Sequence, residues 1–112
     1  MLPEQRKYAR APLTGPVKVF EWNKLVQAGA DQISAGGVFL KTPTALAEGS
    51  LVTVRLMLPG LERAFTVLGK VVRTVRGNLL RPPGLGVWFV DIAQGDRESI
   101  LDYVARRARG AS

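Results

Sequence analysis

The chain has 112 residues, of which 46% are hydrophobic, so it is one small domain that can bury a single core. It contains no cysteine and no histidine, which excludes disulfides, ordinary zinc sites, the usual hydrolase triads and histidine-based acid–base catalysis. Lysine and arginine number 16 against 9 acidic residues, and the resulting net charge of +7 favours anionic partners.

No apolar run approaches the ~20 residues that a helix needs to cross a bilayer, and the N-terminus lacks a signal-peptide pattern. We therefore expect a cytoplasmic protein without a membrane span. The charge is compatible with phosphate ligands, nucleic acid or an acidic protein, and equally with a basic surface that only aids solubility. No paired carboxylates, P-loop or dinucleotide fingerprint is present, so we predict no enzyme, no metal site and no cofactor.

The chain opens with a segment of little periodicity. Residues 1–15 contain prolines and a glycine, which predicts an arm that lies on the domain and is not a strand. Tyr8 is the residue expected to anchor this arm on the barrel. We assign residues 1–15 to the arm and residues 16–112 to the domain proper.

Short strands are predicted next. Val17–Trp22 is of β type, and residues 24–34 are less clear but end in the strong turn signal Ala35-Gly36-Gly37. Val38–Leu40 is a further short apolar strand. Segments of this length are typical of a small barrel.

The middle of the chain holds the clearest alternation. In the strand Leu51–Leu58, every second residue is apolar and is predicted to face the core: Val52, Val54, Leu56 and Leu58. A long strand over 63–76 presents Phe65, Val67, Val71 and Val75 on one face. Gly69 indicates a bend or bulge in it, and a proline-stiffened loop follows over 78–84.

The segment Gly84–Val90 is apolar on both faces, so another element must cover its outer side. The helix predicted over Asp96–Arg109 is the available cover, with Asp96 as a cap at its start. Its predicted apolar stripe consists of Ile100, Leu101, Val104 and Ala108. Together these elements predict a mainly β fold, a closed six-stranded antiparallel β-barrel with a C-terminal α-helix.

Two arginines in the arm are the first candidate site residues. Arg6 and Arg10 lie four residues apart, and a planar guanidinium suits phosphate oxygens, the O6/N7 edge of guanine and stacking on a purine. Taken alone, the pair is more simply explained as two solvated arginines near a terminus.

The turn after residue 34 supplies the other candidates. On a strand, Gln32 and Ser34 share one face while Ile33 points to the core. Gly37 lets a ligand approach the backbone closely. Taken alone, the fragment is again explained as a hairpin corner in which Ser34 bonds its own backbone.

In combination, these fragments resemble the PilZ domain family. The resemblance rests on the arm with Arg6 and Arg10, the later Ile33-Ser34-Ala35-Gly36-Gly37, and Gly84-Leu85-Gly86-Val87-Trp88-Phe89 ahead of a terminal helix. It extends over about residues 4–109, and it is carried by the order and spacing of the motifs.

The resemblance implies a six-stranded barrel that binds the bacterial second messenger cyclic di-GMP. By this likeness, Arg6 and Arg10 would clamp phosphates and guanines, while Ser34 and Gly37 match the family's motif. Gln32 stands where the family usually has Asp or Asn, and an amide offers one acceptor where a carboxylate offers two. The loss of a charge-assisted bond costs about 1.5–3 kcal/mol, roughly ten- to a hundredfold in affinity. The neighbouring Asp31 faces away unless the strand is bulged.

Three hypotheses follow. The first is a cyclic di-GMP receptor without enzymatic activity that relays its signal to a separate, unidentified effector protein. The second is a degenerate PilZ-type module that binds a protein and no nucleotide. The third is a small basic barrel for single-stranded nucleic acid, ranked last of these because Trp22 and Trp88 lie in runs that look buried.

Overall fold

The computed structural model describes residues 8–61 and 63–110. In these ranges the fold is mainly β with one helix, which confirms the predicted class. The elements are β1 (Ala11–Pro12), β2 (Pro16–Glu21), β3 (Lys24–Ser34), β4 (Gly37–Lys41), β5 (Leu51–Leu56), β6 (Phe65–Val75), β7 (Gly84–Asp91) and α2 (Gln94–Gly110).

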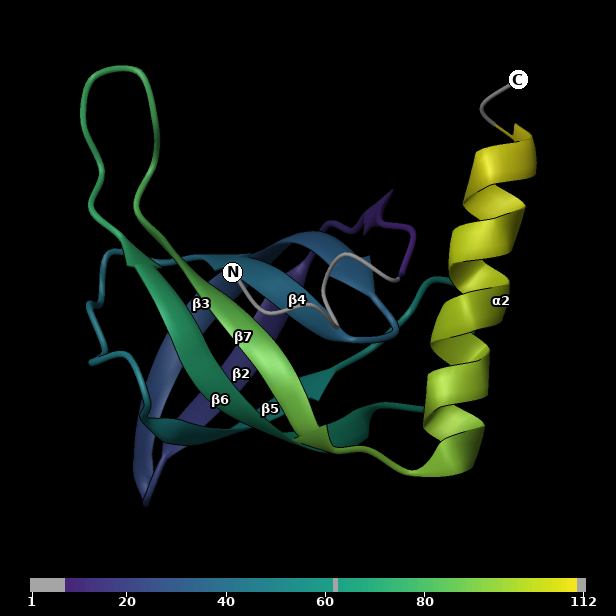
Figure 1. Cartoon of the computed structure of the whole chain (residues 1–112), viewed down its shortest axis with the longest axis horizontal. Coiled ribbons are helices and arrows are strands. Elements are labelled where there is room, and N and C mark those ends of the chain that lie inside the picture. Colours follow the sequence, from purple (N-terminus) through teal and green to yellow (C-terminus); the bar gives the residue numbers. More distant parts are fainter. Residues whose placement is uncertain (1–7, 62, 111–112) are drawn as a thin grey trace.

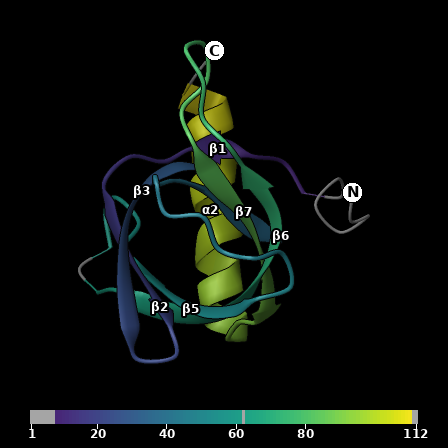
Figure 2. The same ribbon diagram turned by 90° about the vertical axis from the view of Figure 1, so that its left-hand side faces the viewer.

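Strands β2 to β7 form the predicted six-stranded antiparallel barrel. Their order is β3-β2-β5-β6-β7-β4, and the pairing of β4 with β3 closes the ring. Figure 2 looks through the ring, with α2 standing across its far end; Figure 1 shows the same helix beside the barrel. The barrel interior is filled by apolar side chains with no measurable exposure: Val19, Leu40, Val54, Val67, Val71, Leu85 and Val87.

Strand β5 follows the predicted alternation. Val52, Val54 and Leu56 are buried, Thr53 is half-buried and Arg55 is exposed. Leu58 is buried just after the strand ends, as its spacing predicts. Burial of each such side chain contributes about 1.5–3 kcal/mol to the free energy of folding. A shift of β5 by one residue would expose these side chains, so the alternation favours a single register.

The arm contributes a strand that the sequence analysis excluded. Ala11 pairs with Ile33 and Pro12 with Gln32, so β1 lies antiparallel along the last residues of β3. The expectation of an arm that is not a strand is therefore wrong for residues 11–12. A strand of two residues is too short to show a periodic pattern in the sequence. Its extended conformation is set by its pairing with β3.

The helix begins two residues earlier than expected, at Gln94, and Asp96 does not cap it. Asp96 instead lies in the first turn, where its carboxylate oxygen accepts a hydrogen bond from Arg63 at 2.8 Å. The buried stripe is made by Ile100, Tyr103 and Val104. Leu101 and Ala108 are exposed, so the predicted stripe was wrong at these two positions.

The helix also covers a different surface from the one predicted. Its main contacts are with β3 and β1 at one end of the barrel, and the Tyr103 hydroxyl donates to the Pro12 carbonyl at 2.7 Å. The first part of β7, at Gly84 and Gly86, is covered on its outer side by the ring of Phe39 on β4. A Cβ on Gly84 would lie 2.7 Å from that ring, so the glycine makes the space that Phe39 occupies.

Candidate ligand-binding site

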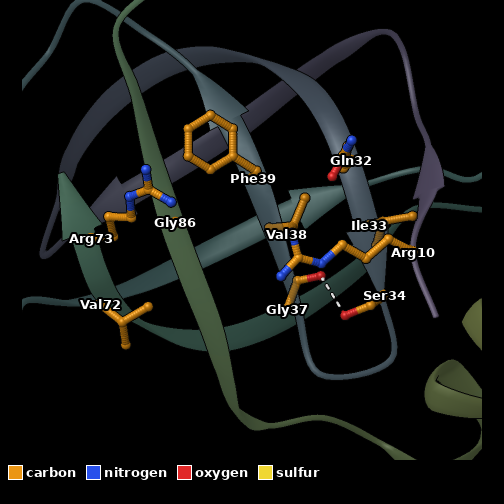
Figure 3. Close-up of a pocket in the computed structure, with 10 residues that line it drawn as sticks. All are labelled: Arg10, Gln32, Ile33, Ser34, Gly37, Val38, Phe39, Val72, Arg73 and Gly86. Atoms are coloured by element: carbon orange, nitrogen blue, oxygen red, sulfur yellow. Dashed lines mark hydrogen bonds between the residues drawn. The ribbon is translucent and has the colours of Figure 1, made fainter. Parts of the chain in front are cut away.

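A shallow pocket of about 80 Å³ opens on the outer surface of the barrel, over β4 (Figure 3). It collects residues from β3, β4, β6, β7 and the arm. The lining residues are Arg10, Gln32, Ile33, Ser34, Gly37, Val38, Phe39, Val72, Arg73 and Gly86. Four of the five predicted site residues therefore meet in one place, although they come from three separate segments.

A bulge in β3 brings Gln32 to this pocket. Ala30 pairs with Leu40 and Gln32 with Phe39, which leaves Asp31 as the extra residue. Val26, Ala28 and Ala30 face the core, so regular alternation would also turn residue 32 inward. The bulge shifts the alternation by one, and Gln32 becomes exposed while Ile33 is buried.

Asp31 is the extra residue of this bulge and is half-buried, but the bulge does not bring it round to the pocket. Its carboxylate lies 3.7 Å from the Lys41 ammonium, and both side chains are partly exposed. Asp31 does not line the pocket. It therefore does not stand in for the carboxylate that Gln32 lacks.

A second bulge, in β6, brings an arginine to the opposite side of the pocket. Val71 pairs with Val87 and Arg73 with Gly86, so Val72 is the extra residue. Phe65, Val67 and Val71 face the core, and regular alternation would bury residue 73 as well. The shift instead turns Arg73 outward to the pocket mouth (Figure 3).

The register of β6 with β7 bears on two expectations, the direction of Val75 and the irregularity at Gly69. Val75 pairs with Gly84 on the outer side of the sheet, so it does not share the inner face of β6 as predicted. A register shift does occur beside Gly69, as expected, and there the extra residue is Val90 on β7.

The short strand β1 places Arg10. Because Ala11 pairs with Ile33, the preceding residue comes beside Ser34 at the end of β3. In Figure 3 the Arg10 side chain extends from this edge over Gly37. Arg10 and Arg73 thus approach the pocket from two different sides, and among residues 8–61 and 63–110 no acidic side chain lines it.

Ser34 and Gly37 form the corner of the pocket, and both also stabilise the local fold there. The Ser34 hydroxyl accepts from the Gly36 amide at 3.2 Å and donates to the Gly37 carbonyl at 3.5 Å, so its single proton is already used. Gly37 has no left-handed φ, and a Cβ there would overlap the carbonyl oxygen of Val87. The glycine is thus required for the close pairing of β4 with β7.

Phe39 gives the pocket an apolar side. Its ring lies over Gly84 and Gly86, and a Cβ on Gly86 would be 3.8 Å from the ring and 3.3 Å from the Cβ of Arg73. A planar aromatic face beside two guanidinium groups suits a ligand that carries both negative charge and flat rings.

Sequence reasoning missed Arg73 and Phe39. The sequence did contain a signal for Arg73. The apolar residues of the long strand occupy odd-numbered positions, and Arg73 places a charge at one of these positions. Arg6, the remaining predicted site residue, lies outside the described residues. Within the described part of the chain, no group of three acidic residues is placed to hold a metal ion, and no helix is long and apolar enough to span a membrane.

Trp22 does not fit the expectation of burial: it is 94% exposed at the turn between β2 and β3. Its φ of 59° is in the left-handed region, which is unusual for a large side chain. Trp88 is half-buried on β7 and does not line the pocket. The two tryptophans therefore form no common stacking face.

Comparison with solved structures finds the same fold in several bacterial proteins. The chain aligns with the inhibitor of motility MotI/DgrA of Bacillus subtilis at a TM-score of 0.82 and 21% identity, covering 94% of this chain and 52% of that one. It aligns with YcgR of Escherichia coli in complex with c-di-GMP at 0.71 and 17%, covering 96% and 47%. The chain thus spans about half the length of these two proteins.

A third structure is a single domain of similar size. The PilZ domain of Escherichia coli YcgR with c-di-GMP aligns at a TM-score of 0.64 and 19% identity, covering 96% of this chain and 94% of that one. No curated protein sequence matches the chain. The PilZ domain family matches residues 4–106. Because this match covers nearly the whole chain and agrees with the barrel, the protein belongs to the PilZ domain family.

Proposed function

We propose that the protein is a cyclic di-GMP receptor that binds the dinucleotide in the pocket over β4. The observation that carries the proposal is the meeting of Arg10, Gln32, Ser34 and Gly37 around one pocket. Arg73 adds a second guanidinium across from Arg10. The ligand is a dianion with two guanines, so it needs both charge and planar surfaces for recognition.

The size of the pocket indicates how the ligand is held. A volume of about 80 Å³ is well below the ~300–1,000 Å³ of a site that encloses a small molecule. This small volume supports a dinucleotide that lies on the barrel surface and is covered from the other side. The arm before residue 8, with Arg6, is the segment that we propose closes over it.

Contacts at the end of the arm offer a route from the pocket to the helix. Arg97 of α2 donates from Nη1 to the Tyr8 hydroxyl and to the Ala35 carbonyl, both at 3.2 Å. Tyr8 belongs to the arm, and Ala35 lies in the turn between Ser34 and Gly37. Closure of the arm would move Tyr8 and so change its hydrogen bond with Arg97. We propose that an effector protein in the cytoplasm responds to this change at the helix.

Calorimetry with cyclic di-GMP and the full chain tests the proposal. We expect Arg6→Ala and Arg10→Ala each to abolish detectable uptake, because each removes a charge-assisted contact to the dianion. Arg55→Ala is the control: its exposed guanidinium is on β5, across the barrel from β4. Binding by both arm variants at the parent's affinity would contradict the clamp.

Gln32 favours one second candidate, a PilZ-type module that binds a protein and no nucleotide. The amide removes an acceptor, and the nearby Asp31 does not line the pocket. Absence of binding at ~100 μM ligand, equivalent to weaker than about −5.5 kcal/mol, would favour this module over the receptor. Binding of single-stranded nucleic acid has less support, since the tryptophans lie on different parts of the barrel and form no stacking face.

A further inference from the structure

The loop between β6 and β7 projects from the barrel as a narrow hairpin and carries two exposed leucines at its tip. Figures 1 and 2 both show it extending beyond the strands. Leu79 is fully exposed and Leu80 is 96% exposed. Two adjacent, uncovered leucines on a projecting turn are unusual, because each retains the full cost of contact with water.

The tip is built as an ordered turn. The Asn78 amide donates to the Arg81 carbonyl at 2.8 Å, and the Asn78 side-chain oxygen accepts from the Leu80 amide at 2.8 Å. Lower down, Gly77 packs so closely on Pro83 that a Cβ would lie 2.5 Å from the proline ring. The two leucines are therefore held out in a defined conformation, and little entropy is lost when something covers them.

The charge around the tip is of one sign. Arg76 and Arg81 flank the leucines, both exposed, and the sequence has no acidic residue from position 63 to position 90. At the base of the hairpin, the Glu48 carboxylate accepts a hydrogen bond from the Thr74 amide at 3.3 Å. The tip thus combines apolar side chains with a positive surround.

We propose that this tip inserts into the surface of an anionic phospholipid bilayer. A bilayer takes up isolated leucines in its interfacial region while its headgroups attract the arginines. A protein partner fits less well, because a stable interface needs roughly 800 Å² on each side and two leucines on a narrow hairpin present far less. This inference does not depend on cyclic di-GMP binding.

Vesicle co-sedimentation tests the proposal. We expect the full chain to bind vesicles of phosphatidylcholine with phosphatidylglycerol, and to bind pure phosphatidylcholine vesicles much more weakly. L79S/L80S should lower the partition coefficient at least about tenfold on the anionic vesicles. R76S/R81S should lower it about tenfold or more on the anionic vesicles, with no effect on the neutral ones.

Trp22→Ser is the matched control. Trp22 is equally exposed but lies at the β2–β3 turn, at the other end of the barrel from the leucine tip (Figure 1). The control should bind anionic vesicles like the parent, and all variants should keep the parent's melting temperature and cyclic di-GMP calorimetry, because the altered side chains are exposed and outside the pocket.

Three results would overturn the proposal. One is no sedimentation of the parent with anionic vesicles. Another is an equal loss of binding in Trp22→Ser and L79S/L80S, which would show general hydrophobic adsorption. The third is a parent that self-associates in solution and becomes monomeric in L79S/L80S without any vesicle binding, which would make the tip a contact between copies of the chain.

Discussion

Strands β5 and β6 are neighbours in the barrel, yet they behave differently along their lengths. In β5 the side chains alternate without interruption between the core and the solvent. In β6 the alternation holds up to Val71, and the extra residue Val72 then turns Arg73 outward to the pocket. The comparison shows that the pocket lies where the alternation breaks, and that the regular strand contributes no residue to it.

Strand β3 shows the same break in alternation on the other side of the pocket. Its regular part supplies Val26, Ala28 and Ala30 to the core, and the bulge at Asp31 turns Gln32 outward. Two independent bulges thus face the same pocket. A residue that would be a costly buried polar group in a regular strand becomes an exposed residue of the pocket lining in a bulged one.

The largest expected effect comes from filling the close contact at the pocket corner. Gly37→Ala should lower the free energy of unfolding by about 3 kcal/mol, because the new methyl overlaps the Val87 carbonyl and forces β4 away from β7. Urea denaturation measures it. Gly29→Ala on β3 is the control, since a Cβ there meets nothing within 4 Å, and its stability should stay within about 0.5 kcal/mol of the parent. Equal stability of the two variants would contradict this account of the corner.

The second test compares the two neighbouring strands directly. Arg73→Ala should weaken cyclic di-GMP binding about ten- to a hundredfold, because a charge-assisted bond is lost, while the free energy of unfolding changes by less than about 0.5 kcal/mol. Arg55→Ala on β5 should alter neither quantity. Calorimetry and urea denaturation of both variants decide the matter, and unchanged affinity in Arg73→Ala would remove Arg73 from the site.

The third test concerns the bulge in β3. Gln32→Asp should strengthen cyclic di-GMP binding about tenfold, since a carboxylate accepts two guanine N–H groups with charge assistance. Gln27→Asp is the matched control, because Gln27 is exposed on the same strand before the bulge and does not line the pocket. The same calorimetric titration measures both, and a similar gain in both variants would indicate a general charge effect.

The smallest effect is expected at the far end of the barrel. Trp22→Gly should raise the free energy of unfolding by about 1 kcal/mol, because glycine adopts the φ of 59° without the penalty that other residues carry. Trp22→Ala keeps that penalty and should not stabilise the protein. Thermal unfolding of the pair isolates the backbone contribution, and identical melting temperatures would show that the turn is not strained.

Much of the barrel could be predicted from the sequence, and the reason is local. Alternation assigned every buried residue of β5, and the turn signal at Ala35-Gly36-Gly37 located the hairpin between β3 and β4. The four predicted site residues that lie in the described ranges were named from motifs, and they line one pocket. The helix was also expected, and its predicted stripe was right at Ile100 and Val104 but wrong at Leu101 and Ala108, because Tyr103 is buried in their place once the helix is docked on β3 and β1.

The sequence by itself determined the six barrel strands, though not β1, and which residue types gather near the turn, since both follow from periodicity and backbone preferences of a few neighbouring residues. Tertiary structure alone decided that Arg73 and Gln32 face the same pocket and that Phe39 covers the glycines of β7. Each of these depends on the register between strands distant in the chain, and one extra residue in a strand reverses the direction of every side chain that follows it.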